Sequence, residues 1–216
     1  SIIASKLSSK INRTIVSTDS LEFAEIARYY GAEVPFLRPT EFAQDDSDAI
    51  DYVKHVLEWC TTNENSHPEY LVLLCPPTPL RDPALVDEAI VKILNCDKAT
   101  SLRSAKEAKE SPYKFFTIKN GFYEGMFPDD PRLEYYNLPR QAFPPVYDPN
   151  GYVDIIKSRI IYETGSLNGS WILSFITPEG GDIDTIEDFE FVEFLLNRSS
   201  NPIYEYLKAN YPKYEL

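Results

Sequence analysis

The sequence is poor in cysteine, histidine and basic side chains, and each shortage excludes a class of protein. Its three cysteines, Cys60, Cys75 and Cys96, stand singly, which argues against a disulfide framework or a zinc site and favours a reducing cytoplasm. Lysine and arginine number 21 against 34 aspartate and glutamate residues, so the net charge of −13 argues against a nucleic-acid partner. No apolar run approaches the roughly 20 residues that span a bilayer, and no membrane partner is expected.

What the sequence does contain is an alternation of strand-like and helix-like segments. With 216 residues and 43% hydrophobic content, the chain is expected to form one domain, residues 1–216. The uninterrupted apolar run Tyr70–Leu74 is typical of a strand covered on both faces, and shorter strands are expected at Thr14–Val16 and Glu33–Leu37. The alternation predicts the α/β class, with a doubly wound and mostly parallel sheet. In such a sheet ligands gather beyond the carboxyl ends of the strands, which here means after Val16, Leu37, Leu74 and Ile156.

Three helices between these strands have recognisable starts or apolar faces. The first is expected to begin with a capping box of Asp19 and Glu22, to bury Phe23 on its apolar face, and to end at Gly31. The second covers 47–63, where the apolar residues Ile50, Val53, Leu57 and Cys60 follow helical spacing. The third runs from the cap Asp82 through residue 94.

An aromatic segment interrupts this alternation. Residues 113–123 read as two short strands joined by a turn at Asn120-Gly121, which is a strong hairpin signal. We expect an inserted hairpin or dimer element near residues 111–150, because its aromatic side chains would leave a large apolar patch on a monomer.

The segment Pro139–Gly151 combines stiffness with polar chemistry. It holds four prolines, which exclude a long helix or a central strand. Arg140 offers a planar fork for a carboxylate or phosphate, and Gln141 and Asn150 can both donate and accept. A pocket for an acidic, hydroxyl-rich ligand such as a sugar acid is one interpretation; a proline-rich surface connection is the other.

Asp182 and Asp184 are the candidate metal ligands. Two carboxylates one residue apart at a strand end can hold Mg²⁺, which prefers oxygen ligands. The competing interpretation is that Thr185 caps the following helix with Asp188 as its partner and that both aspartates are solvated; the local sequence alone favours it slightly. Arg81 is the last residue of the proline-rich loop 75–81. Its side chain suits a helix cap and a pair with Asp82 equally well.

Taken in order, these segments resemble the acylneuraminate cytidylyltransferases, which activate sialic, legionaminic and related nine-carbon acids as CMP-sugars. The resemblance runs from about Ser1 to Leu196 and is carried by Ile15–Asp19, Val34–Pro39, Leu73–Arg81, Pro139–Gln141, Pro149–Gly151 and Asp182–Thr185. It implies a fold like that of the nucleotide-diphospho-sugar transferases and a homodimer. It also implies CTP and a sugar acid as substrates, and Mg²⁺ or Mn²⁺ as the cofactor.

The resemblance assigns roles to ten residues. It implies that Arg38 and Ser47 bind the nucleotide and that Asp182 and Asp184 hold the catalytic metal. It implies a sugar-acid pocket made of Cys75, Thr78, Lys114, Arg140, Gln141 and Asn150.

The chain also departs from the family pattern. Cys75 stands where the family usually has glutamine, Pro77 where it has threonine, and Ala49 where many members have a nucleotide-binding serine. Asp154 replaces a frequent tyrosine, so a sugar acid other than the common sialic acid is expected. The family's first strand and phosphate-binding loop would lie upstream of Ser1, and the chain on its own is therefore expected to be a poor catalyst. Two alternatives stay open: a related nucleotidyltransferase acting on another sugar, and a non-catalytic dimeric remnant of the family.

Overall fold

A four-stranded mixed sheet lies at the centre of the protein. The computed structural model describes residues 1–44, 46–178, 181–198 and 200–211. The strand order is β1-β5-β2-β6, with bounds Tyr70–Leu73, Tyr147–Lys157, Ser101–Glu107 and Ile172–Ile176. β5 is antiparallel to β1 and β2, whereas β2 and β6 are parallel. Three strands therefore share one direction and only β5 is reversed. The predicted α/β class is confirmed.

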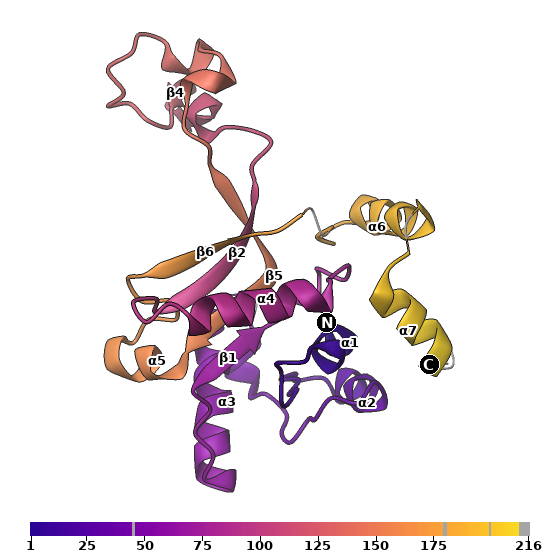
Figure 1. Ribbon diagram of the computed structural model, residues 1–216. Coiled ribbons are helices and arrows are strands. Elements are labelled where there is room, and N and C mark those ends of the chain that lie inside the picture. Colours follow the sequence, from indigo (N-terminus) through magenta and orange to yellow (C-terminus); the bar gives the residue numbers. More distant parts are fainter. Residues whose placement is uncertain (45, 179–180, 199, 212–216) are drawn as a thin grey trace.

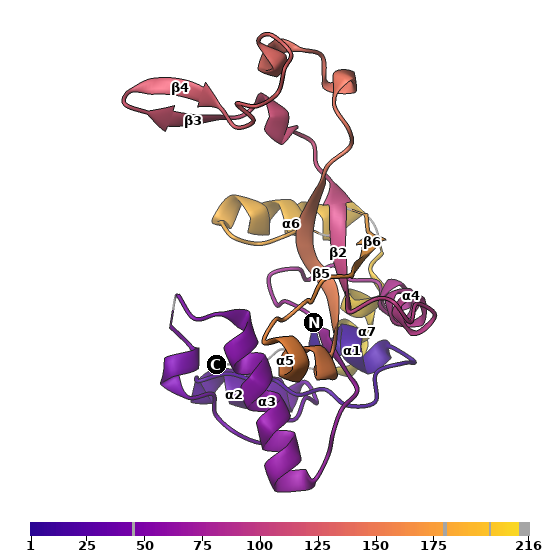
Figure 2. The same ribbon diagram turned by 90° about the vertical axis from the view of Figure 1, so that its left-hand side faces the viewer.

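Helices cover both faces of this sheet, as the predicted double winding requires (Figures 1 and 2). On one face α3 (Ala49–Glu64) packs Val53 and Leu57, and α5 (Ser158–Thr164) packs Ile161, against Ile156 of β5. On the other face α4 (Pro83–Leu94) packs its apolar side chains against Leu102 of β2 and neighbouring strand residues. Asp82 caps α4 as predicted, because its carboxylate accepts a 2.9 Å hydrogen bond from the backbone N–H of Ala84.

Four further helices lie around the two ends of the chain. α1 (Ile2–Leu7) packs Ile3 and Ala4 against Ile203 of α7 (Pro202–Asn210), and α2 (Leu21–Tyr29) forms a small separate core. α6 (Ile186–Arg198) follows the segment that carries the two candidate metal ligands. Among the described residues, no helix has the length and apolar character needed to cross a membrane.

Four local predictions were wrong in this first part of the chain: two strands, one helix cap and one buried side chain. Thr14–Val16 and Glu33–Leu37 form no strands in the described structure; a single parallel bridge joins Ile15 to Glu33. The cap of α2 is Ser20 rather than Asp19, and its hydroxyl accepts from the N–H of Phe23 at 3.2 Å. The Phe23 side chain is 60% exposed, because α2 buries only its alanine face. The predicted end of this helix is confirmed, since Gly31 has the left-handed φ of 91°.

Residues 108–146 form an arm that projects from the far end of β2 and β5 (Figure 1). It contains the predicted hairpin, β3 (Phe116–Lys119) and β4 (Phe122–Gly125), whose turn places Asn120 and Gly121 at φ 53° and 84°. Short 3₁₀ turns complete the arm at Pro112–Lys114, Tyr135–Asn137 and Arg140–Ala142, and another lies outside the arm at Thr40–Phe42.

The arm has a small aromatic core of its own. The Tyr113 ring stacks between the rings of Phe127 and Phe143, with centroids 4.3 and 4.9 Å away. The Tyr135 hydroxyl accepts a 2.8 Å hydrogen bond from the N–H of Phe127. These contacts make the arm a folded unit rather than an unstructured loop.

A bulge separates the core part of the β2–β5 ladder from its arm part. Arg103 pairs with Asp154, yet Ala105, only two residues further along β2, pairs with Pro149. One residue of β2 (Ser104) therefore faces four residues of β5 (150–153). Two side-chain hydrogen bonds close the gap: Val153 N–H donates to Ser104 Oγ at 2.9 Å, and Ser104 N–H donates to Asp154 Oδ1 at 3.1 Å. Residues 150–153 thus arch out of the ladder.

Candidate active site

The candidate site lies where β1 and β6 end and where β5 arches out of the sheet. The loop after β1 and the segment after β6 meet here, since the N–H of Ile183 donates to the carbonyl of Pro77 at 2.9 Å. The arch 150–153 reaches the same place. The prediction that the segment after Ile156 also lies at this edge was wrong, because β5 runs antiparallel to its neighbours and ends at the opposite edge.

Thr78 connects three segments at the centre of the site. Its side chain is only 1% exposed, and its Oγ1 lies 3.0 Å from the carbonyl oxygen of Asn150 and 3.4 Å from Oδ1 of Asp182. The Asn150 amide in turn donates to Oγ1 of Thr177, just beyond β6, at 2.7 Å. The structure therefore brings together three of the residues that the sequence nominated, from three separate stretches of chain. Thr177 is an additional member that the sequence reasoning missed.

Cys75 packs against the arch at Gly151. A Cβ atom at Gly151 would lie 3.1 Å from the Cβ and 3.3 Å from the Sγ of Cys75, and Gly151 has the left-handed φ of 58°. Both observations require glycine at this position. Burial raises the pKa of the Cys75 thiol and the nearby Asp154 carboxylate raises it further, so the thiol is neutral at physiological pH. Cys75 therefore lines the site with an uncharged side chain.

Arg81 holds the loop after β1 to the arch, a role that sequence reasoning did not foresee. Its side chain is fully buried, and its guanidinium donates to the carbonyl oxygens of Tyr152 at 2.6 Å, Gly151 at 2.8 Å and Cys75. Burial lowers the pKa of Arg81 to about 10, so it stays charged at neutral pH. In the sequence analysis Arg81 was interpreted as a helix cap or as a partner of Asp82. The structure replaces both interpretations by hydrogen bonds from Arg81 to backbone carbonyls. The loop prolines and the lone arginine were the only signals of it.

Arg38 lies on the α3 side of the site. Its Nε donates to the Ser17 hydroxyl at 3.1 Å, and its guanidinium lies 4.9 Å from the centre of the Tyr52 ring. Burial raises the pKa of the Tyr52 phenol, and the Cys75 thiol adds to that rise. Tyr52 therefore stands within electrostatic reach of both Arg38 and Cys75, and it connects the predicted nucleotide residue with the rest of the site.

Ser47 lies in the turn before α3, where its hydroxyl accepts from the N–H of Gln44 at 2.9 Å and donates to the carbonyl of Glu41 at 3.2 Å. These contacts stabilise the turn. The nucleotide-binding role of Ser47 stays a prediction.

Asp182 and Asp184 have the chemistry of a site for a hard cation. Both side chains are exposed, and among the described residues neither forms an ion pair with a lysine or arginine. Thr78 and the Ile183–Pro77 hydrogen bond fix the segment beside the arch. No cluster of three or more potential ligands occurs in the described part of the chain, but Mg²⁺ is usually held by one or two carboxylates and takes its other oxygens from water and phosphate. The pair fits such an ion.

The helix cap proposed as the alternative is also present. Thr185 and Asp188 form it reciprocally: Asp188 Oδ2 accepts from the N–H and hydroxyl of Thr185 at 2.9 and 2.8 Å, and the N–H of Asp188 lies 3.2 Å from Thr185 Oγ1. The N–H of Asp184 donates to the same Asp188 carboxylate at 3.2 Å. The cap therefore uses the backbone of Asp184 and leaves its carboxylate available.

Lys114, Arg140 and Gln141 lie in the arm, apart from these residues. Arg140 donates to Glu107 Oε1 at 3.1 Å and to the carbonyl of Ala108 at 2.9 Å, and Lys114 donates to the carbonyl of Leu138 at 3.1 Å. Arg140 and Gln141 line a cavity of about 360 Å³ at the base of the arm. Within one chain, none of the described hydrogen bonds of Lys114 or Arg140 reaches Thr78, Asn150 or Asp182.

Comparisons with known proteins show which family the chain belongs to. No protein-family model matches the chain. The chain is 30% identical over 204 residues to the CMP-N,N'-diacetyllegionaminic acid synthase of Campylobacter jejuni, covering 91% of this chain and 82% of that protein. It is 28% identical over 209 residues to the N-acylneuraminate cytidylyltransferase of Escherichia coli, which covers 94% of this chain but only 47% of the longer relative.

Solved structures support the fold. A CMP:2-keto-3-deoxy-manno-octonic acid synthetase superposes with a TM-score of 0.61 at 12% identity, covering 90% of this chain and 85% of that chain. A 4-diphosphocytidyl-2C-methyl-D-erythritol synthase from Anaerococcus prevotii gives 0.59 at 11% identity, covering 91% and 86%. At these sequence identities the structural likeness is evidence for the fold alone. The relatives in sequence show that the chain belongs to the acylneuraminate cytidylyltransferase family of nucleotidyltransferases.

Proposed function

We propose that this protein transfers CMP from CTP to a nine-carbon 2-keto-3-deoxy sugar acid of the sialic or legionaminic acid type and releases pyrophosphate. The relatives named for these acids support the reaction class. The single observation that carries the proposal is the convergence of Thr78, Asn150 and Asp182 at one end of the sheet. Ligands bind at this edge in open α/β sheets.

In the proposed reaction the anomeric hydroxyl of the sugar acid attacks the α-phosphorus of CTP. A new P–O bond forms, the bond to the β-phosphate oxygen breaks, pyrophosphate leaves, and the hydroxyl proton passes to solvent or to a basic group. Asp182 and Asp184 would hold Mg²⁺ or Mn²⁺, which when bound neutralises charge on the phosphates. The work of the chain itself is to position both substrates and to supply fixed charges and dipoles around them.

Each element of the site has a role in this proposal. Arg38 and the turn at Ser47 take the nucleotide, and the neutral Cys75 and the hydroxyl of Thr78 line the sugar-acid side. The arch gives the pocket its shape, because Arg81 fixes it to the loop after β1 through three carbonyl groups.

The arm is proposed to complete the pocket from a second copy of the chain. Phe116, Ile118, Phe122 and Tyr123 of the hairpin are all exposed, although large apolar side chains usually pack against something. A homodimer formed through this hairpin would cover them. Arg140, Gln141 and Lys114 would then bind the sugar acid at the interface, with Arg140 on the substrate carboxylate. A cytoplasmic location is proposed as well, since the three cysteines are all free thiols.

The test is an assay of pyrophosphate release. The purified protein is incubated with CTP, Mg²⁺ and, in separate reactions, sialic acid, legionaminic acid, pseudaminic acid and the eight-carbon keto-deoxy-octonic acid; UTP replaces CTP in a parallel series. We expect release, weak for the chain on its own, with CTP and at least one nine-carbon acid. Release only with the eight-carbon acid or only with UTP would replace the proposal by a related nucleotidyltransferase. A protein that binds a sugar acid in calorimetry but releases no pyrophosphate would be the non-catalytic remnant.

A further inference from the structure

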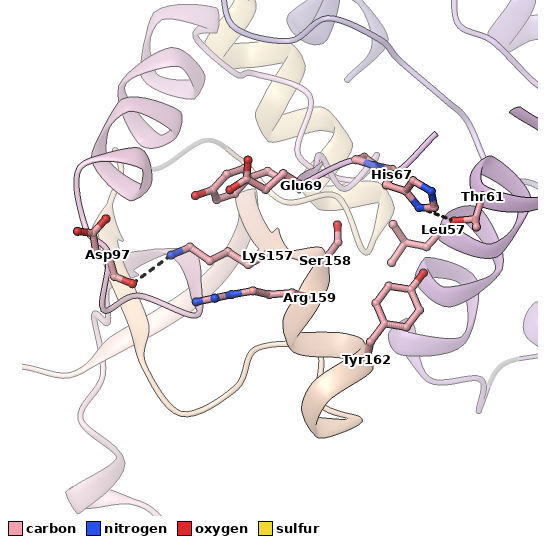
Figure 3. Close-up of a pocket in the computed structure, with 11 residues that line it drawn as sticks. Leu57, Thr61, His67, Glu69, Asp97, Lys157, Ser158, Arg159 and Tyr162 are labelled. Atoms are coloured by element: carbon pink, nitrogen blue, oxygen red, sulfur yellow. Dashed lines mark hydrogen bonds between the residues drawn. The ribbon is translucent and has the colours of Figure 1, made fainter. Parts of the chain in front are cut away.

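The sheet face that α3 covers is only half covered. α3 and α5 lie over β1 and β5, and side chains of both helices line a cavity of about 530 Å³ at the edge away from the candidate site (Figure 3). Over β6 the same face is open. Leu173 and Phe175 of β6 pack into the core under α4, so strand alternation turns Ile172 and Ile176 to the α3 face, where they are 50% and 49% exposed.

Asp154 and Arg103 lie side by side where the covered half of this face meets the open half. The register of the sheet places them in one row across the strands, between Leu73 of β1 and Ser174 of β6. Leu73 packs against the core under α3, so residues paired in this row point to the same face. The row ends at the open side of the sheet.

The bulge in the ladder fixes the Asp154 carboxylate, and this carboxylate orients Arg103. Asp154 Oδ1 accepts the 3.1 Å hydrogen bond from the N–H of Ser104, and its Oδ2 lies 3.4 Å from Nε of Arg103. The Asp154 side chain is 16% exposed and that of Arg103 is 46% exposed. In the described structure the two terminal amino groups of Arg103 form no hydrogen bond. Arg103 is therefore an oriented guanidinium whose outer donors are free.

Both side chains lie within electrostatic reach of the candidate site. Burial raises the pKa of the Cys75 thiol, Asp154 raises it further, and Arg103 counteracts the rise. Asp154 also adds to the rise that burial causes in the pKa of the Tyr52 phenol. Cys75 and Tyr52 both belong to the candidate site, so the Asp154–Arg103 pair extends that site across the sheet toward β6.

The pair suits a neutral polar group better than an anion. Asp154 balances the charge of Arg103, so the pair attracts an anion less than a lone arginine would, while the free N–H groups still donate to a carbonyl oxygen. Ile176 supplies an apolar surface beside these donors, two residues along β6 from Ser174, the partner of Arg103. An acylamido group combines a carbonyl oxygen with an apolar methyl group and matches this arrangement.

We propose that Arg103, held in place by Asp154, binds the carbonyl oxygen of an acylamido group on the sugar acid, with Ile176 against the methyl group. The inference rests on the proposed function. It adds Arg103 as a binding residue that sets specificity and Asp154 as its positioning residue. Asp154 stands where the family often has tyrosine, and the pair with Arg103 gives this replacement a role.

The test is calorimetric titration with three sugar acids, in the presence of Mg²⁺ and α,β-methylene-CTP, a nucleotide that cannot react. The acids are N,N'-diacetyllegionaminic acid, N-acetylneuraminic acid and the deaminated counterpart of the latter, in which a hydroxyl replaces the acetamido group. We expect at least one acylamido acid to bind about tenfold or more tightly than the deaminated acid, because a hydrogen bond from a charged donor is gained. Equal affinity for the three acids, or no binding of any, would overturn the proposal.

Variants of Arg103 test its role directly. Arg103→Met keeps an unbranched side chain and removes the donors, so it should weaken binding of the acylamido acids about tenfold and leave that of the deaminated acid unchanged. Arg103→Lys keeps the charge without the fork and should retain part of the preference. Arg159→Met, the same change at an exposed arginine that lines the cavity at the far edge, should have no effect. A preference retained in Arg103→Met, an equal loss for all three acids, or the same loss in Arg159→Met would refute the binding role.

Asp154→Asn distinguishes positioning from a structural role. It should reduce the preference for acylamido acids, because Arg103 is no longer held, and leave the affinities for the nucleotide analogue and the deaminated acid unchanged. A loss of all affinities together would show that Asp154 serves only the fold. Thermal unfolding verifies that each variant is folded.

Pyrophosphate release from CTP tests the proposed reaction separately. Wild-type protein that releases pyrophosphate but binds the three acids alike contradicts this inference alone. Discrimination among the acids without release contradicts the proposed reaction and supports the role of Arg103.

Discussion

Replacing Thr78 by valine tests the centre of the candidate site, because valine has nearly the same shape and lacks only the hydroxyl. The hydroxyl is buried and lies 3.0 Å from the Asn150 carbonyl and 3.4 Å from the Asp182 carboxylate. Without it, the Asn150 carbonyl loses its partner, at a cost of about 1–3 kcal/mol in the free energy of unfolding. For a chain of this length each kcal/mol lowers Tm by about 2–4 °C, so we expect a decrease of about 2–12 °C.

Ser101→Ala is the matched control for this change. Ser101 is also fully buried, but its hydroxyl has no hydrogen-bond partner among the described residues. Its removal should be neutral or slightly stabilising. Thermal unfolding followed by circular dichroism compares the two variants. The reasoning is refuted if Thr78→Val unfolds at the wild-type temperature, or if Ser101→Ala loses as much stability.

Measuring turnover distinguishes a role of the Thr78 hydroxyl in the site from a role in stability alone. Thr78→Ser keeps the hydroxyl and should keep most of the activity at a temperature where every variant is folded. Thr78→Val should lose activity, since the Asp182 carboxylate then loses its side-chain contact and only the Ile183–Pro77 hydrogen bond still fixes its segment. Equal activity of the two variants would show that the hydroxyl serves only the fold.

Four further predictions concern the metal ligands, the arm and a buried acid. Asp184→Asn should abolish metal-dependent turnover and leave the circular dichroism spectrum unchanged; wild-type turnover would remove the metal assignment. Arg140→Ala should raise KM for the sugar acid far more than KM for CTP, and Lys114→Ala should do so more weakly; equal effects on both substrates would contradict the carboxylate role. Light scattering at micromolar concentration should report a dimer, and Phe122→Asp should yield monomers; a wild-type monomer would refute the hairpin interface. Burial raises the pKa of the Asp154 carboxyl, so the folded protein is more stable while this group is protonated and loses that stability as pH rises through the raised pKa. Asparagine stays neutral, so the stability of Asp154→Asn relative to wild type should increase from acidic to neutral pH, as measured by urea unfolding.

The sequence predicted most elements that depend on local signals. The helical spacing of Val53, Leu57 and Cys60 correctly indicated the buried face of α3, and Asn120-Gly121 correctly placed the hairpin turn, because each signal lies within one element. The predictions that failed depended on distant partners. The apolar residues around Ile15 looked like a strand, but strand pairing is decided by what lies alongside, and here only a single bridge forms.

The same distinction applies to the site. Asn150 and Asp182 were nominated from their own chemistry and Thr78 through the family resemblance, and the contacts among them span 72 and 104 residues of sequence. Arg81 and Thr177 were missed as contributors to the site, because their partners are backbone carbonyls in the first case and a single amide in the second. Every residue carries a backbone carbonyl, so the sequence does not indicate which carbonyl a buried side chain will contact. The direction of β5 was missed for a related reason: alternating strands and helices predict parallel neighbours, whereas β5 returns from an inserted arm and so enters the sheet reversed.

The arch 150–153 has a consequence for how the candidate site can change in evolution. The ladder on each side of it has its own pairing, Ser101–Arg103 with the end of β5 and Ala105–Glu107 with its beginning. Residues gained or lost within the arch would therefore alter the shape of the candidate site while both ladders kept their register. Under the proposed function, small insertions and deletions at this one place would change the sugar-acid preference without rebuilding either the region around Arg38 or the arm.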